Sequence, residues 1–244
     1  DLVIKALNKG KAVYVEKPLA LDMQSITDIE ESIYRSENPK LFIGFNRRFS
    51  KSAQFIKQKL INSPANSINL RFSVPPLDSD HWTNIKEIGG GRIVGEAVHG
   101  IDLACYLFDS LPQSISASAP VDKTNNMVKD NQVFLNINFA NGSHASLQYF
   151  SEANQILSKE RIEVHGEGNS YILEDFKMLR FLEGSQDRSK TFSTGKGHKE
   201  SLSIFFDYVR DKSQNPFTWE EIKAVSKAAI IAQDHINSGQ QHNV

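Results

Sequence analysis

The sequence contains a single cysteine, Cys105, which excludes a disulfide within the chain and is typical of a reducing compartment. No apolar run approaches the ~20 residues that a membrane span needs, and no secretory signal opens the chain. Neither sign of charge dominates, because 28 lysines and arginines face 29 aspartates and glutamates. That balance offers no attraction for nucleic acid or an acidic membrane. We therefore expect a cytoplasmic location and neither of those partners.

Two phosphate-binding fingerprints are also missing. The sequence contains neither Gly-x-Gly-x-x-Gly nor Gly-x-x-x-x-Gly-Lys-Ser/Thr, the glycine loops that commonly hold nucleotide phosphates. Its composition is that of a globular protein, with 39% hydrophobic and 23% charged residues among 244. The chain opens at Asp1, directly inside a helical pattern. We expect it to be a fragment whose beginning is missing.

The first 63 residues predict part of a parallel sheet. Residues 12–15 and 41–43 are short continuous apolar runs, as in buried parallel strands. The helical pattern of residues 22–36 lies between them, and a strand–helix–strand unit is almost always right-handed and parallel. A second helix is predicted over residues 50–61. Two strands alone do not form a stable sheet, so we expect further strands upstream of Asp1.

The pattern changes near Ser63-Pro64. Residues 134–150 alternate apolar and polar side chains on both sides of Asn141-Gly142, a strong hairpin turn signal. Similar short segments surround a second turn between residues 164 and 171. This alternation predicts an antiparallel meander with one apolar face. The predicted fold class is therefore α/β (α+β), a remnant of a parallel sheet followed by a mostly antiparallel open sheet with helices on one face.

Residues 93–108 predict a long helix that is largely buried, because apolar side chains cover most of its circumference. Glu96, His99 and Asp102 nevertheless recur every three residues and form a polar stripe. Unpaired buried charge is costly, so the stripe either faces a cleft or its members pair with one another. Glu-x-x-His is also half of a known type of metal site. No second motif completes such a site, so we expect no metal.

Cations follow both strands of the predicted parallel sheet. Lys17 comes just after the first strand and Arg47 just after the second. Open parallel sheets bind ligands beyond the carboxyl ends of their strands, so both cations should lie at one ligand-binding edge. Such a pair suits an anionic or polyhydroxylated ligand. The alternative is that both residues simply end their strands in solvent.

These segments, in this order, resemble the Gfo/Idh/MocA family of nicotinamide-dependent oxidoreductases. Glu16-Lys17-Pro18 resembles the family's EKP motif, and residues 42–49 resemble its next strand and substrate-side turn. Residues 89–102, which begin with three glycines, resemble its active-site helix. The resemblance implies that residues 1–63 end a dinucleotide-binding Rossmann domain. Residues 64–244 would then form a domain for substrate binding and oligomerisation.

The resemblance also implies a reaction: hydride transfer between NAD or NADP and a sugar, sugar derivative or cyclitol-like alcohol. His99 would accept the hydroxyl proton, and Lys17 would stabilise negative charge on the reacting oxygen. Glu16, Lys17 and Pro18 would lie on the cofactor side, with a cis peptide bond before Pro18. We expect Lys17, His99 and Arg47 to converge on one cleft.

The resemblance assigns the substrate side to Asn46, Arg47, Glu96 and His198. One position departs from the family pattern: many members carry Asp four residues before the histidine, whereas this chain has Gly95. The neighbouring Glu96 is rotated by ~100° around a helix. The motif around it resembles a subgroup in which this unit is often fused behind a zinc-type alcohol-dehydrogenase-like unit.

Alternatives to a dehydrogenase stay open. Without a Rossmann half, the chain would be inactive alone, and it could be a non-catalytic ligand-binding or oligomerisation module. NAD-dependent glycoside cleavage is a third reading. In each case we expect a homodimer or homotetramer, because two phenylalanines fall on the predicted helix-free face of the sheet. That face carries Phe134, Asn136, Asn138, Ser146, Gln148 and Phe150.

Overall fold

The computed structural model describes residues 1–76, 86–120, 132–193 and 195–238. A small parallel sheet of two strands lies at the N-terminal end, with Tyr14 opposite Phe42. Both predicted helices of this region are present, and each begins at a polar cap: the side chains of Asp22 and Ser50 accept hydrogen bonds from backbone N–H groups three residues on. The elements here are α1 (Leu2–Leu7), β1 (Val13–Val15), α2 (Met23–Arg35), β2 (Leu41–Ile43), the 3₁₀ turn η1 (Asn46–Phe49) and α3 (Lys51–Leu60).

A larger sheet of eight strands follows, in the spatial order β10-β9-β8-β7-β3-β6-β5-β4. The predicted hairpins are present as β5–β6 and β7–β8. The strands are β3 (Ser67–Ser73), β4 (Pro112–Ser118), β5 (Gln132–Phe139), β6 (His144–Phe150), β7 (Glu160–Gly166), β8 (Asn169–Glu174), β9 (Met178–Glu183) and β10 (Gln186–Thr191).

The large sheet departs from a meander at one place. β3 inserts between β6 and β7, and it pairs in parallel with β6 and antiparallel with β7. Its inward side chains Ile68, Leu70 and Phe72 are all buried, as befits a central strand. Such long-range pairing leaves no trace in the local alternation of β3, which reads the same at an edge as at the centre. The mixed α/β fold with a mostly antiparallel sheet is confirmed.

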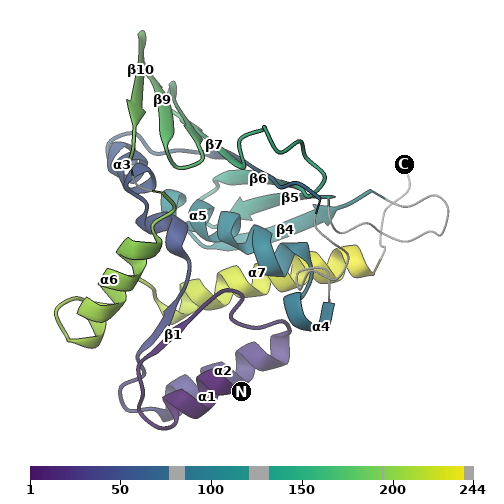
Figure 1. Ribbon diagram of the computed structural model, residues 1–244, viewed down its shortest axis with the longest axis vertical. Helices are drawn as coiled ribbons and strands as arrows, with labels where there is room; N and C mark the ends of the chain where they lie inside the picture. Colours follow the sequence, from purple (N-terminus) through teal and green to yellow (C-terminus); the bar gives the residue numbers. More distant parts are fainter. Residues whose placement is uncertain (77–85, 121–131, 194, 239–244) are drawn as a thin grey trace.

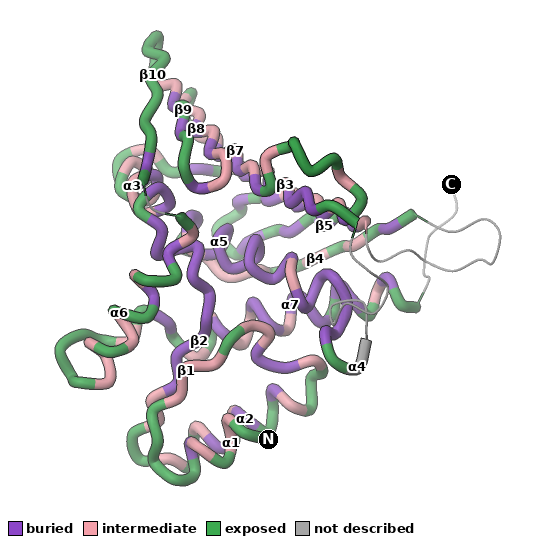
Figure 2. Tube along the Cα trace, viewed as in Figure 1, coloured by how far each residue is buried: buried purple, intermediate pink, exposed green. Residues whose placement is uncertain are grey.

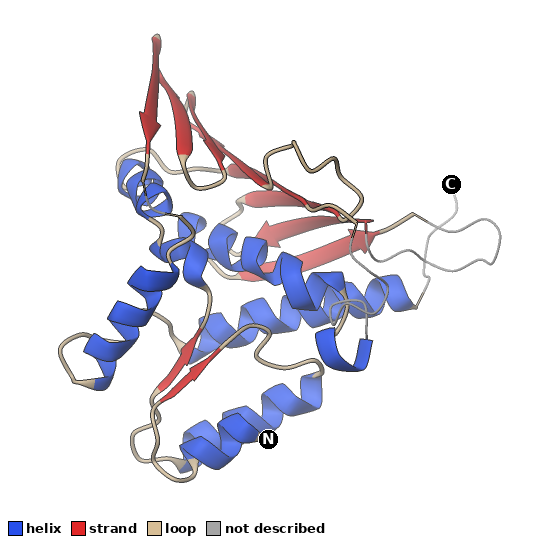
Figure 3. Ribbon diagram, in the orientation of Figure 1, coloured by secondary structure: helices blue, strands red, loops and turns tan. Residues whose placement is uncertain are grey.

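Helices cover one face of the large sheet (Figure 3). The predicted helix over residues 93–108 is present as a π-helical turn η3 (Ile93–Ala97) that continues into α5 (Val98–Phe108). Gly100 lets α5 approach the sheet, because a Cβ there would overlap the side chain of Leu147. The other helices are α4 (Lys86–Gly89), α6 (His198–Val209) and α7 (Trp219–Asn237), which begins with a capping box at Thr218.

Burial alternates along the strands as the one-sided sheet requires. On β5, Leu135 and Ile137 are fully buried while Phe134 and Asn136 are exposed. β10 is exposed along its whole length (Figure 2). One apolar core joins the small sheet to the large one, so the domain boundary near residue 63 stays a prediction. Within the described residues, no helix has both the length and the apolar character needed to cross a membrane.

Candidate active site

Lys17 reaches from the small sheet to the glycine-led helix. It follows β1, and its Nζ donates to the carbonyl oxygen of Gly95 at 2.6 Å and to Oε1 of Glu96 at 3.0 Å. The peptide bond between Lys17 and Pro18 is cis, as the resemblance implied. Behind Lys17, the carboxylate of Glu16 lies over Gly44, where a Cβ would come within 2.6 Å of Oε2. The ammonium group is thereby fixed against η3.

His99 lies one turn further along the same helix and is buried, with 5% of its surface exposed. Its ring meets Phe45 edge-on at 6.5 Å between centroids. Burial lowers the pKa of His99 well below its usual value, and the positive charges of Arg47 and Lys17 lower it further. The ring is therefore neutral near pH 7, which is the form that accepts a proton. Among the described residues, its buried Nδ1 has no hydrogen-bond partner.

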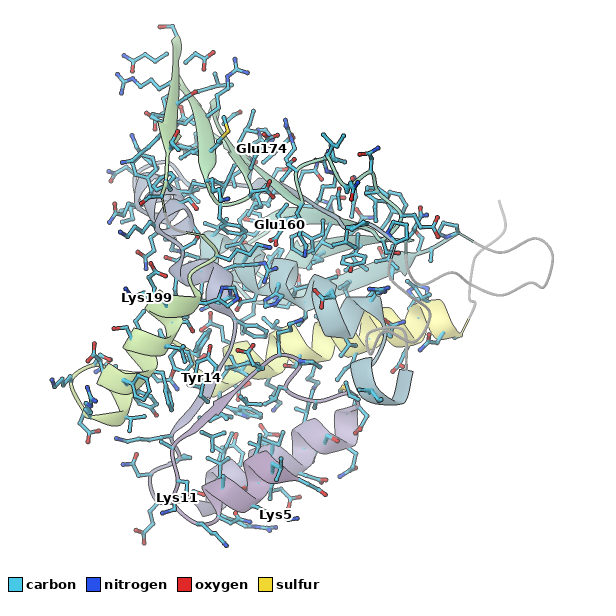
Figure 4. All side chains as sticks on the ribbon, viewed as in Figure 1. Lys5, Lys11, Tyr14, Glu160, Glu174 and Lys199 are labelled. Carbon is cyan, nitrogen blue, oxygen red and sulfur yellow. The ribbon has the colours of Figure 1, made fainter. Side chains whose placement is uncertain are left out.

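Arg47 is bound to an acid rather than left exposed. Its Nε and Nη2 donate to the carboxylate of Glu160 at 2.7 and 2.9 Å. Glu160 is the first residue of β7 and is buried near the centre of the molecule (Figure 4). A second cation, Lys196, also binds this carboxylate. Burial opposes the ionisation of Glu160, but the two cations outweigh it and keep its pKa below the usual value.

Asn46 connects the turn after β2 to the loop before α6. Its Nδ2 donates to the carbonyl oxygen of Lys196 at 2.9 Å and lies 2.9 Å from Nε2 of His198. Gly197, between them, has a φ of +84° and presses on η1, where a Cβ would come within 2.6 Å of the backbone nitrogen of Ser50. The loop that carries Lys196 and His198 is thus held against the turn that carries Asn46 and Arg47.

Two members of the polar stripe on the long helix are paired with cations from other elements, and not with one another. Glu96 pairs with Lys17, whereas Asp102 is buried and binds Arg48 at 2.5 and 3.2 Å. Arg48 also donates to Glu221 on α7 at 3.0 Å. Burial raises the pKa of Asp102 to about 6, although Arg48 acts in the opposite direction. The buried Arg48–Asp102 pair is structural and fixes α5 to η1.

The structure adds three residues that the sequence did not single out: Glu160, Lys196 and Tyr149. Tyr149 lies on β6, and its hydroxyl is 3.5 Å from Nη1 of Arg92. Burial, followed by the charge of Glu96, raises the pKa of Tyr149 to about 12. Glu160 and Tyr149 left no local signal, because an acid at a strand start and a tyrosine within one are ordinary. Lys196 lies two residues before His198, and only His198 was considered in the sequence.

The predicted site residues other than His99 form two groups of linked side chains. Lys17 with Glu96 forms the first group. The second consists of Arg47, Asn46 and His198, joined by Glu160 and Lys196. Charges from both groups act on His99. Within the described ranges, no three His, Cys, Asp or Glu side chains are placed to hold a metal ion.

The chain is therefore a two-sheet α/β protein. A parallel strand pair shares one core with a large sheet that has helices on one face, and a helix of that core carries a buried histidine. Residues 64–172 match the family model described as the GFO/IDH/MocA C-terminal domain. This match supports the resemblance to the Gfo/Idh/MocA family that the motifs of the sequence indicated.

Known relatives support this resemblance. An inositol 2-dehydrogenase of Rhizobium meliloti is 26% identical over 222 residues, covering 79% of this chain and 65% of the relative. A myo-inositol 2-dehydrogenase of Thermotoga maritima is 23% identical, covering 98% and 69% respectively. The chain thus spans about two thirds of the length of these relatives. The fold is also that of the aldose-aldose oxidoreductase from Caulobacter crescentus complexed with glycerol, with a TM-score of 0.82 at 15% identity over 98% of this chain and 74% of that one.

Proposed function

We propose that the protein carrying this chain is a dehydrogenase that transfers hydride between NAD or NADP and a hydroxyl-bearing carbon of a sugar, sugar derivative or cyclitol. The observation that carries the proposal is the buried, neutral His99 on a helix that binds the ammonium group of Lys17 one turn earlier. Relatives named as inositol dehydrogenases support the substrate class. We expect the enzyme in the cytoplasm as a homodimer or homotetramer.

In this proposal, oxidation of an alcohol removes a hydride from carbon and a proton from oxygen. A bound nicotinamide supplies the hydride acceptor. The neutral ring of His99 takes the hydroxyl proton, as a general base must. Lys17, which is bound to the same helix one turn earlier, stabilises the negative charge that develops on the oxygen as the proton leaves.

The residues present fit a nicotinamide on one side of the site. Ligands of open parallel sheets bind beyond the carboxyl ends of the strands, and residues 16–18 follow β1 at that edge. The buried Nδ1 of His99 has no hydrogen-bond partner among the described residues, which supports a polar ligand at this site. Glu16, Lys17 and Pro18 would line the cofactor side. The 244 residues contain no glycine fingerprint for the pyrophosphate, so we expect them to be inactive alone.

On the substrate side we place Asn46, Glu96 and His198. Arg47 belongs to the same side, but Glu160 occupies two of its donor nitrogens, so we assign it a supporting role. Their short polar groups suit sugar hydroxyls. A non-catalytic ligand-binding module is the second candidate, and the observation that favours it is Gly95 at the position where many relatives carry Asp.

A substrate panel separates the two candidates. The full-length protein is incubated with NAD or NADP and with inositols, hexoses and their derivatives, and the absorbance of the reduced cofactor is followed. The dehydrogenase proposal predicts turnover of at least one polyol that Lys17→Ala strongly reduces, while the exposed control Lys11→Ala behaves as wild type. Ligand binding without any cofactor reduction would favour the non-catalytic module.

A further inference from the structure

The side-chain amide of Asn46 is buried, and its neighbours fix its orientation. Its Nδ2 donates to the carbonyl oxygen of Lys196 at 2.9 Å and lies 2.9 Å from Nε2 of His198. Its Oδ1 accepts from Nη1 of Arg47 at 3.5 Å. A carbonyl oxygen only accepts hydrogen bonds, so the atom of Asn46 that faces Lys196 has to be the nitrogen.

This orientation decides which nitrogen of the His198 ring carries the proton. An amide NH₂ group only donates, so the Nε2 atom that it contacts must be the unprotonated nitrogen of a neutral ring. The proton of that ring is then on Nδ1. The hydrogen bond that one ring nitrogen makes sets the state of the other in this way.

Asn46 cannot easily turn to suit the other tautomer. A reversed amide would place its oxygen against the carbonyl oxygen of Lys196 and its nitrogen against the guanidinium group of Arg47. Each pair would then consist of two acceptors or two donors, and buried polar groups without a partner are costly. The neighbours are themselves held, because Gly197 is pressed against η1 and Arg47 binds a buried carboxylate. The ring of His198 therefore adapts to Asn46.

The other nitrogen of the ring is left to a ligand. His198 is exposed, and among the described residues the only hydrogen bond of its ring is the one to Asn46. With the lone pair of Nε2 engaged and the proton on Nδ1, a neutral ring donates but has no lone pair left to accept a proton. Such a donor suits a hydroxyl, carbonyl or carboxylate oxygen.

We propose that Asn46 is a positioning residue that holds the neutral ring of His198 in the Nδ1–H tautomer, so that His198 serves as a hydrogen-bond donor to an oxygen of the substrate. The proposal deepens the proposed function and rests on it for the substrate. The tautomer itself is measurable without substrate or cofactor.

The test is a long-range ¹H–¹⁵N NMR correlation spectrum of the ¹⁵N-labelled 244-residue chain, recorded above neutral pH, where histidine rings are ordinarily uncharged. Loss of signals in His198→Gln identifies the ring. In the wild type, Nε2 should resonate far downfield of Nδ1, as an unprotonated ring nitrogen does. In Asn46→Asp, the carboxylate only accepts, so Nε2 should take the proton and the two nitrogens should exchange their shifts.

Asn138→Asp is the matched control. Asn138 also contacts a histidine ring, that of His144, but both residues are exposed. This variant should leave the signals of His198 unchanged.

A wild-type spectrum with the proton on Nε2 of His198 would overturn the proposal, and this measurement needs no variant to fold. Signals of His198 that are the same in Asn46→Asp as in wild type would also overturn it. Should Asn46→Asp not fold, Asn46→Ala removes the donor instead, and the Nε2 signal should move upfield. An unmoved signal there would show that Asn46 does not set the tautomer.

The donor role is tested with the full-length protein and a polyol that it oxidises. His198→Phe removes the N–H group and should raise KM several-fold with a smaller change in kcat, because it removes binding of the ground state. A fall in kcat at unchanged KM would contradict a role in holding the substrate.

The outcome for the proposed function is separate. If Nδ1 carries the proton but the full-length protein reduces neither NAD nor NADP, the positioning of the ring by Asn46 stands and the proposed dehydrogenase fails. If the protein oxidises a polyol while Nε2 carries the proton, the dehydrogenase stands and the positioning role fails.

Discussion

At the scale of single residues, the site is built from charges that are paired across elements. Lys17 binds Glu96, Arg48 binds Asp102, and Arg47 shares Glu160 with Lys196. Each buried acid is therefore compensated, whereas His99 remains uncharged among cations. This distribution lets a buried ring act as a proton acceptor without an ion pair of its own.

Removing Glu160 should show how much the buried pair matters. Glu160→Gln leaves the buried Arg47 without its countercharge, which typically destabilises a protein by about 3–5 kcal/mol. Urea unfolding at neutral pH would measure the loss. Glu183→Gln is the matched control, because Glu183 also pairs with a lysine but is partly exposed, and we expect about 0–1 kcal/mol there. Equal losses for the two variants would contradict the structural role given to Glu160.

The sequence predicted part of this site for physical reasons. Lys17 and Arg47 follow parallel strands, so the topology alone places them at one edge. His99 was recognisable because a polar residue on an otherwise apolar helix needs an explanation. The partners were not predictable, since Glu160 lies 113 residues from Arg47 along the chain and meets it only when β7 enters the sheet.

At the scale of elements, caps and periodicity specified the helices and hairpins, whereas the pairing of distant strands had no local signal. The side chains of Asp22, Ser50 and Thr218 each cap the first turn of a helix. β3 was not recognised as the central strand between β6 and β7. The loop before α6 also depends on tertiary contacts, and its position sets that of Lys196.

Gly197 is the residue on which that loop depends. Gly197→Ala would place a side chain at a φ of +84° and against the backbone of η1, so we expect a loss of more than about 1 kcal/mol. Gly184→Ala is the control, because Gly184 has a φ of +58° but open space around its Cα. Thermal unfolding of both variants separates the cost of the contact from that of the backbone conformation. A loss no larger than that of Gly184→Ala would mean that the loop is not pressed against η1.

At the scale of the whole molecule, the large sheet has one face packed by helices and one that carries exposed rings. Phe134 and Phe150 contact each other at 5.6 Å between centroids on the second face, and Phe134 is 39% exposed. Apolar rings on an open sheet face are typical of a surface covered by a partner.

We therefore predict self-association through this face. Sedimentation at micromolar concentration should show a dimer or tetramer for the wild type and a shift towards monomer for Phe134→Lys, because a charge would have to be buried in the contact. Phe206→Lys alters an exposed ring on α6 instead and should leave the assembly unchanged. A wild-type protein that sediments only as a monomer would contradict this prediction.

The central claim is that His99 accepts the proton during alcohol oxidation, and steady-state kinetics of the full-length protein test it most directly. We predict that His99→Ala lowers kcat by roughly 10²–10⁴-fold, the usual contribution of general acid–base catalysis, while the exposed His144→Ala behaves as wild type. Turnover by His99→Ala within a few-fold of wild type would contradict the account, because another group would then have to accept the proton.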